Sequence, residues 1–300
     1  MAISRNQLVK ELEPGLNALF GLEYKQYENQ AAEIYTTESS DRAFEEEVML
    51  SGFASARVKP EGSGVAFDNA QETFTARYTN ETIALAFAIT EEAIEDNLYD
   101  RLASRYTKAL ARSMASTKQV KGAAPLNNGF GAFQSGDNVA LFSTAHPTIA
   151  GTFSNTLATA ADLNETSLEQ ALIDIAALTD ERGLKIAAKG VKMIIPSALQ
   201  FTAERLMKSQ GRVSTADNDI NAIRSMGMIP QGYRVNNYLT DTDAFFITTD
   251  VPNGMKHFNR APLTTKMEGD FDTGNVRYKA RERYVFGVSD PRGIFASPGA

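Results

Sequence analysis

The sequence predicts an α+β fold in which a long helix packs on a β-sheet and a separate α/β unit follows. Apolar and polar residues alternate from Glu72 to Ile89, as they do along a half-buried strand. From Thr90 to Lys121 the apolar residues instead recur at every fourth position, which is typical of a helix that buries one side. Beyond Thr166, short helix and strand patterns follow one another. Together these observations favour two packed units.

The composition excludes several classes of site. A chain of 300 residues buries about 75% of the surface of its unfolded form, so it needs neither disulfides nor a metal to fold. The sequence has no cysteine, which excludes zinc ribbons, iron–sulfur clusters and thiolate nucleophiles. His146 and His257 are its only histidines, so a multi-histidine metal site is also excluded. We therefore expect no cofactor.

The charge is acidic overall and unevenly placed. The formal net charge is −7, and residues 1–50 carry ten acidic and four basic side chains, against 27 and 26 in the rest of the chain. A protein that grips DNA needs a basic stripe, and we expect none here. The longest stretch without charged residues, 138–161, is polar and contains Pro147, so it should not span a membrane. With no signal segment in the first fifty residues, we expect a soluble protein that is cytoplasmic at synthesis.

Residues 1–50 are expected to form an acidic N-terminal arm. Its residues should be mostly helical or irregular, because Pro14-Gly15 and Gly21 break any long helix. The run Glu45-Glu46-Glu47 is typical of a solvated face.

A projecting hairpin is predicted next, over residues 52–71. Two short apolar-polar stretches flank the turn-forming residues 59–64, which include Pro60, Gly62 and Gly64. If each arm runs about ten residues at about 3.3 Å per residue, the tip lies on the order of 30 Å from the base.

A strand over Glu72–Ile89 and a spine helix over Thr90–Lys121 should form the long unit. Gly122 and Pro125 are expected to end the helix, whose length is roughly 40 Å. The residues that define its buried stripe are Ile94, Leu98, Leu102, Tyr106 and Leu110. The polar stretch from Gly122 to Asn164 that follows is too long for a structureless connection, so it is either disordered or ordered by something outside the subunit.

The α/β unit is expected to start with a capping box at residues 166–169. The further elements that the pattern predicts are a strand over Val191–Ile195 closed by Pro196, a helix over Ala198–Lys208, a short helix ending at Met226, strands over Tyr233–Leu239 and Ala244–Thr249, and a long strand over Asn275–Val288.

Only two residues suggest chemistry. His146 could act as a general base for Ser143 or Thr144, but a loop histidine whose ring bonds a backbone carbonyl is the favoured interpretation. Lys59, at the hairpin tip, could form an isopeptide cross-link with a neighbour, but a solvated turn lysine is favoured because no partner can be identified.

Three segments cannot find enough buried contacts within their own subunit: the acidic arm, the hairpin and the long polar loop. Ordering them costs about 1–2 kcal/mol per residue in backbone entropy, so contacts with sibling subunits should supply the missing burial. The hairpin residues expected to make these contacts are Gly52, Phe53, Lys59, Pro60, Gly62, Gly64 and Phe67. The function therefore depends on assembly.

The succession of elements resembles the major capsid protein of tailed bacteriophages, with the Hong Kong-type capsid fold, and is most similar to Mu-like major head subunits. Besides the order of arm, hairpin, strand and spine helix, the segments that carry the resemblance are 141–147 (LFSTAHP), 191–199 (VKMIIPSAL), 278–288 (YKARERYVFGV) and 290–295 (DPRGIF).

The resemblance implies a structural protein and not an enzyme. Such a subunit self-assembles into hexamers and pentamers of an icosahedral shell, which encloses double-stranded DNA without sequence-specific binding. Portal, scaffolding and possible decoration proteins would be its partners, and no membrane is involved. The protein would be found in the virion, after assembly in the host cytoplasm.

The resemblance also implies four regions. These are an N-terminal arm over 1–50, an extended loop over 51–72, a peripheral domain over 73–160 and 266–288, and an axial domain over 161–265 and 289–300. Two alternatives stay open: an encapsulin-like compartment of the same fold that encloses cargo protein, and a hydrolase that uses His146.

Replacing Leu102 with Asp should abolish soluble subunit, because the spine helix would then bury an unpaired charge. The yield of soluble protein and its midpoint of thermal unfolding provide the check. Unchanged thermal stability would contradict the place of Leu102 on the buried stripe.

Overall fold

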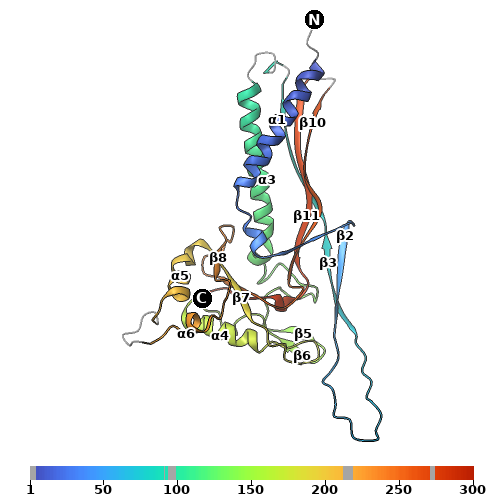
Figure 1. The fold of residues 1–300 in the computed structure, drawn as a ribbon, viewed down its shortest axis with the longest axis vertical. Helices are drawn as coiled ribbons and strands as arrows, with labels where there is room; N and C mark the ends of the chain where they lie inside the picture. Colours follow the sequence, from blue (N-terminus) through green and yellow to red (C-terminus); the bar gives the residue numbers. More distant parts are fainter. Residues whose placement is uncertain (1–4, 91, 94–98, 212–218, 271–273) are drawn as a thin grey trace.

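The computed structural model describes residues 5–90, 92–93, 99–211, 219–270 and 274–300. A long unit of two helices and a twisted sheet stands above a compact α/β unit, and a hairpin loop projects past the α/β unit in the opposite direction from the N-terminus (Figure 1). The two units match the α+β architecture that the sequence predicts.

The long unit is built on a four-stranded sheet. Its strand order is β1 (Thr36–Ser39), β10 (Met255–Gly269), β11 (Val276–Val288) and β4 (Glu81–Ile89), in which only the β1–β10 pair is parallel. Helices α1 (Arg5–Gln26) and α3 (Tyr99–Asn127) lie along one face of this sheet (Figure 1). The side chains that fill the space between them include Phe20, Leu110, Met114, Tyr278 and Ala280.

The long strand predicted over residues 275–288 is confirmed as β11, and its residues alternate between two faces. Val276, Tyr278 and Ala280 of β11 are buried under the helices, whereas Arg277 and Lys279 are exposed on the opposite face. The period of two therefore identifies both the strand and the face that it buries.

The spine helix extends further than expected. Gly122 and Pro125 lie inside α3, which ends at Asn127. Gly122 is needed for close packing instead, because a Cβ there would come within 2.5 Å of the Ala31 side chain. Its carbonyl accepts a hydrogen bond of 2.7 Å from the Tyr35 hydroxyl.

Only part of the buried stripe predicted for the spine helix lies among the described residues. Ile94 and Leu98 lie outside the described residues, as does the side chain of Leu102. Leu110 is buried in the core of the long unit. Tyr106 is half-exposed, with its ring centroid 5.8 Å from that of Phe87.

The expectation that Pro14-Gly15 and Gly21 break the arm helix was wrong. Helix α1 continues for 22 residues with Pro14 inside it. Leu16 and Phe20 are buried against the sheet, and this tertiary packing outweighs the poor local helix propensity.

The single strand predicted over residues 72–89 is in fact two strands. Strand β3 (Glu72–Thr79) pairs with β2 (Phe44–Leu50), whereas β4 joins the long sheet. Asn80 lies at the break, where its side-chain amide donates to Ser40 Oγ at 2.8 Å and to the Arg42 carbonyl at 3.0 Å. The hairpin predicted over residues 52–71 is therefore wrong in its bounds. The β2–β3 ribbon forms the paired stem, and residues 51–71 beyond it are a loop that contains no strand.

The α/β unit has a four-stranded sheet of order β12 (Ile294–Ser297), β9 (Phe245–Thr249), β7 (Gly190–Ile195) and β8 (Tyr233–Val235). Helices α4 (Glu165–Ala176), α5 (Gln200–Lys208) and α6 (Ala222–Met226) accompany it. The helices and strands predicted from residue 191 to residue 249 are confirmed in order, although β8 is shorter than expected. The long strand predicted over residues 275–288 as part of this unit is instead β11 of the long sheet. The capping box predicted at residues 166–169 is wrong by two residues, because Asn164 is the N-cap of α4 and pairs reciprocally with Ser167.

The remaining short elements are η1 (Gln30–Glu33), β5 (His146–Thr148), β6 (Gly151–Phe153), η2 (Ser197–Leu199) and η3 (Pro291–Gly293). Strands β5 and β6 pair within the polar stretch from Gly122 to Asn164, which is therefore ordered by its own subunit. This corrects the expectation of disorder or of ordering from outside. Leu141 and Phe142 are buried in a core shared with β9 and β12. No helix among the described residues is long and apolar enough to cross a membrane.

His257 gives the stability of the long unit a pH dependence. The imidazole lies on β10, 4.5 Å from the ring centroid of Phe286, and Nδ1 faces Thr37 Oγ1 at 3.2 Å. Burial, together with the positive charge of Lys118, lowers the pKa of His257 to about 4. Below pH 6.5, His257 therefore binds a proton in the unfolded chain, whereas in the folded chain it stays neutral until the pH approaches 4.

The free energy of unfolding should fall as the pH drops from about 6.5 to about 4, with a loss of roughly 2 kcal/mol by pH 5 from this group. Urea titrations at pH 7 and pH 5, followed by circular dichroism, measure the change. The variant His257→Gln should lose less stability between these two pH values than the unmodified chain. An equal loss in both proteins would contradict the role of His257.

Candidate functional site

The extended loop, residues 51–71, presents large apolar side chains that its own chain does not cover. Residues 52–71 are all exposed. Val58 and Phe67 are 94% and 97% exposed, and Phe53 and Val65 are more than half exposed. Several large exposed apolar side chains on one loop indicate an interaction site, because burying them removes apolar area from water.

The root of the extended loop is closed by hydrogen bonds. The Ser51 N–H donates to the Gln71 carbonyl at 2.8 Å, and the Gln71 N–H donates to Ser51 Oγ at 2.9 Å. Further out, the Ala54 N–H donates to Asp68 Oδ2 at 2.8 Å. Backbone N–H donors therefore hold the pKa of Asp68 below its usual range. These bonds fix the direction in which the loop leaves the molecule, although the residues at its tip are exposed.

The predicted contact residues lie along this whole projection. Gly52 is at the root with a φ of +64°, a conformation that favours glycine, and Phe53 follows it. The tip is a turn in which the Ser63 N–H donates to the Pro60 carbonyl at 3.2 Å. The predicted residues near this turn are Lys59, Pro60, Gly62 and Gly64, and Phe67 lies on the returning arm. Their contact role stays a prediction.

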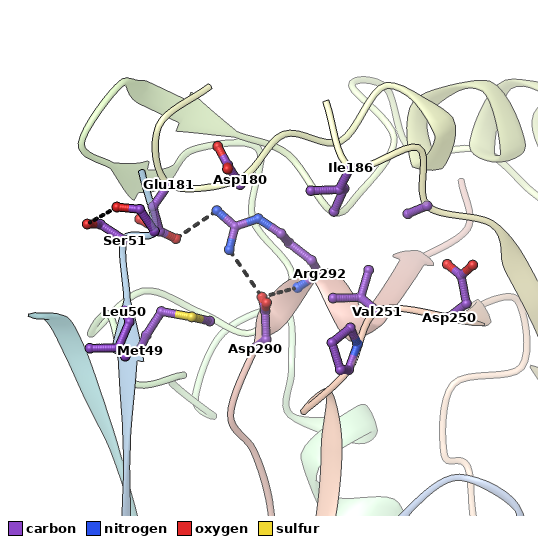
Figure 2. A pocket seen from close by; sticks show the side chains of 13 residues that line it. Met49, Leu50, Ser51, Asp180, Glu181, Ile186, Asp250, Val251, Asp290 and Arg292 are labelled. Carbon is purple, nitrogen blue, oxygen red and sulfur yellow. Dashed lines mark hydrogen bonds and ion pairs between the residues drawn. The ribbon is translucent and has the colours of Figure 1, made fainter. Parts of the chain in front are cut away.

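A hollow of about 330 Å³ lies beside the root of the extended loop. Figure 2 shows Met49 and Leu50 on one side of it, Val251 and Asp250 on the other, and Arg292 between Glu181 and Asp290. The residues that line this root hollow are Met49, Leu50, Ser51, Gly52, Asp180, Glu181, Ile186, Ala188, Asp250, Val251, Pro252, Asp290 and Arg292.

Arg292 is the centre of a buried charge network at this hollow. Its Nη2 lies 2.7 Å from Glu181 Oε1 and its Nη1 lies 3.3 Å from Asp290 Oδ1, while its Nε donates to the Thr179 carbonyl at 2.7 Å. Burial raises the pKa of Asp290, although the charge of Arg292 opposes this shift. The network joins η3 to the segment that follows α4.

A second charge cluster fixes the outgoing strand of the loop. Lys256 of β10 is buried and pairs with Glu38 of β1, at 3.0 Å, and with Glu47 of β2. Burial alone would lower the pKa of Lys256, but the two carboxylates raise it above its usual range. Glu47 also accepts a hydrogen bond from Ser289. Within the run Glu45-Glu46-Glu47, expected to be a solvated face, Glu47 is therefore a structural anchor.

His146 has the structural role that the sequence favoured. It is fully buried, with Nδ1 2.6 Å from Asp137 Oδ2 and Nε2 3.2 Å from the Leu141 carbonyl. Burial alone would raise the pKa of Asp137, but hydrogen bonds from His146, Ser135 and the backbone lower it. Because both ring nitrogens are engaged, the geometry does not support a hydrolase at this position.

The chain matches capsid proteins in two comparisons, one with protein-family models and one with solved structures. The sequence model of a family described as phage capsid protein matches residues 72–297, whereas a search of curated proteins finds no significant match. The capsid of the empty GTA particle aligns with a TM-score of 0.58 and 16% identity over 90% of each chain. The procapsid of bacteriophage JBD30 aligns with a TM-score of 0.55 and 15% identity, over 98% of this chain and 76% of that chain.

A virus-like particle from Pyrococcus furiosus has the same fold. Its chain aligns with a TM-score of 0.55 and 9% identity, over 94% of this chain and 97% of that chain. At these identities, the three structures are evidence of a shared fold alone.

Removing the guanidinium by Arg292→Met should lower the free energy of unfolding of the subunit by about 3–5 kcal/mol, because Glu181 and Asp290 would stay buried without their cation. Urea denaturation measures the loss. The matched control is Lys266→Met, which breaks an exposed pair with Glu268 and should leave the free energy of unfolding nearly unchanged. Equal losses in the two variants would contradict a structural role for the buried network.

Proposed function

The chain belongs to the phage capsid protein family and is a subunit of a phage shell, and we propose that it is the major head subunit, which closes an icosahedral shell of hexamers and pentamers around double-stranded DNA. The extended loop is the observation that supports this proposal most directly. A fold with two complete cores still exposes a rigidly rooted loop with Val58 and Phe67 open to water. A neighbouring subunit would cover these side chains.

The two cores suggest the domains of the shell subunit. The long unit would be the peripheral domain and the α/β unit the axial domain. The boundaries differ from those expected, because residues 255–265 lie in β10 of the long sheet, and Leu141 and Phe153 are buried in the cores around the α/β sheet. Residues 5–26 form helix α1 of the N-terminal arm, docked on the peripheral domain.

The charge on the exposed face of the long sheet matters for a shell that encloses DNA. Arg277, Lys279 and Arg281 form a row of exposed cations on β11, although we expected no basic stripe from the sequence. Arg277 pairs with Asp270, which moderates the charge of the row. Such a short row would allow contact with DNA without the tight adhesion that many phosphate contacts produce.

The further partners that we propose are a portal, a scaffolding protein and decoration proteins, with assembly in the host cytoplasm and a final place in the virion. The rival function is a compartment of the same fold that encloses cargo protein. Particles purified from infected cells and treated with nuclease would distinguish the two, because a phage head protects double-stranded DNA of genome length and a cargo compartment does not.

Replacing residues 52–71 with Asn-Gly should leave a folded subunit that forms no closed shells. The strands β2 and β3 already meet at Leu50 and Glu72, so a short turn can join them without disturbing the stem. Electron microscopy of purified particles tests assembly, and the midpoint of thermal unfolding tests the fold. Closed shells of normal size from this variant would refute the role of the extended loop.

A further inference from the structure

We propose that the root hollow receives the Lys59 side chain from the extended loop of a second copy of this chain. The inference rests on the proposed function, because it names the place where a loop of one shell subunit is held by its neighbour. It is drawn from the chemistry of the hollow and of the loop tip.

The floor of the root hollow carries more negative than positive charge. Asp180, Glu181, Asp250 and Asp290 line it together with a single cation, Arg292. Glu181 is 3% exposed, and only its Oε1 bonds to Arg292. Its Oε2 is buried and has no hydrogen-bond partner. An unsatisfied buried carboxylate oxygen costs roughly 1–3 kcal/mol or more, and a donor that reaches this oxygen would recover that energy.

The walls of the hollow suit the stem of a long basic side chain. Met49, Leu50, Ile186, Val251 and Pro252 line it with apolar groups. Lysine and arginine bury their methylene chains along apolar surface and place the charged head at a polar site. The hollow thus combines an apolar wall with an anionic end, which matches a lysine better than a wholly apolar side chain.

The extended loop carries a lysine that is free to fill this site. Lys59 is exposed next to the tip and has no hydrogen-bond or ion-pair partner among the described residues. Arg57, the other cation on this arm, interacts electrostatically with Asp68 of the same loop. Lys59 is therefore the cation on this arm that has no counterion in the described part of its own subunit.

A lysine at this position fills the hollow of another copy and not its own. Lys59 is eight residues from Ser51, which corresponds to about 26 Å along an extended arm. The loop in Figure 1 points away from the body of its own subunit, and its root is fixed by the bonds of Ser51 and Gln71. A loop that binds the next copy in this way makes a head-to-tail contact, which closes into a ring when the rotation between subunits permits.

Zero-length carbodiimide coupling of the unmodified protein tests the contact directly, because it joins a lysine amine only to a carboxylate that touches it. Shells are assembled from equal amounts of ¹⁴N- and ¹⁵N-labelled subunits, coupled, digested and analysed by mass spectrometry. We expect mixed-isotope peptides that link Lys59 to Asp180, Glu181 or Asp250. Intact shells without such peptides would overturn the inference and leave the proposed function standing, whereas failure of the unmodified protein to form shells would count against the proposed function.

Charge reversal provides a second, independent measurement. Lys59→Glu should raise the protein concentration needed for assembly at least tenfold, whereas Lys59→Arg, the matched control, should change it less than threefold. Lys59 is exposed in the free subunit, so folding should be unaffected by either substitution. A stronger effect of Arg57→Glu, or of Phe67→Ala with Lys59→Glu neutral, would assign the hollow to a different side chain and overturn the inference.

Discussion

The extended loop has to project in a fixed direction although nothing in its own chain covers it. Two buried charge clusters at the base of the loop fix its direction. Lys256 holds β2 to the long sheet through Glu47, and Arg292 organises the floor of the α/β unit through Glu181 and Asp290. Both clusters are buried, so water and salt screen them little, and removing a partner leaves a charge that the interior cannot solvate. An exposed segment is thereby anchored to a firmly packed base.

The sequence predicts the fold well wherever one residue period persists. The alternation along β11 and the short apolar run of β7 closed by Pro196 both identify their strands. Strand β10 escaped prediction because its pairing with β11 shifts register between Asn259 and Thr264, a stretch that includes Pro262. The end of α3 was misjudged because a glycine can serve close packing as readily as helix termination.

The candidate site was predictable only in part. The turn residues near Pro60 and the apolar residues around Phe67 mark a projecting hairpin by local chemistry alone. The root hollow and its charge network leave no such local sign, because Glu181 and Arg292 are 111 residues apart and meet only through the folding of the α/β unit. Similarly, nothing around Glu47 distinguishes it from its two acidic neighbours until Lys256, 209 residues away, is placed beside it.

The order of the elements along the sequence has a kinetic consequence, because β10, β11 and β12 all follow the extended loop. Strand β11 lies between β10 and β4, and β12 forms one edge of the α/β sheet. A nascent chain that already contains the extended loop therefore lacks strands of both sheets until residues 255–297 have been made. Such a chain has no finished neighbour-binding surface, so synthesis itself delays association until these strands have been made and have folded.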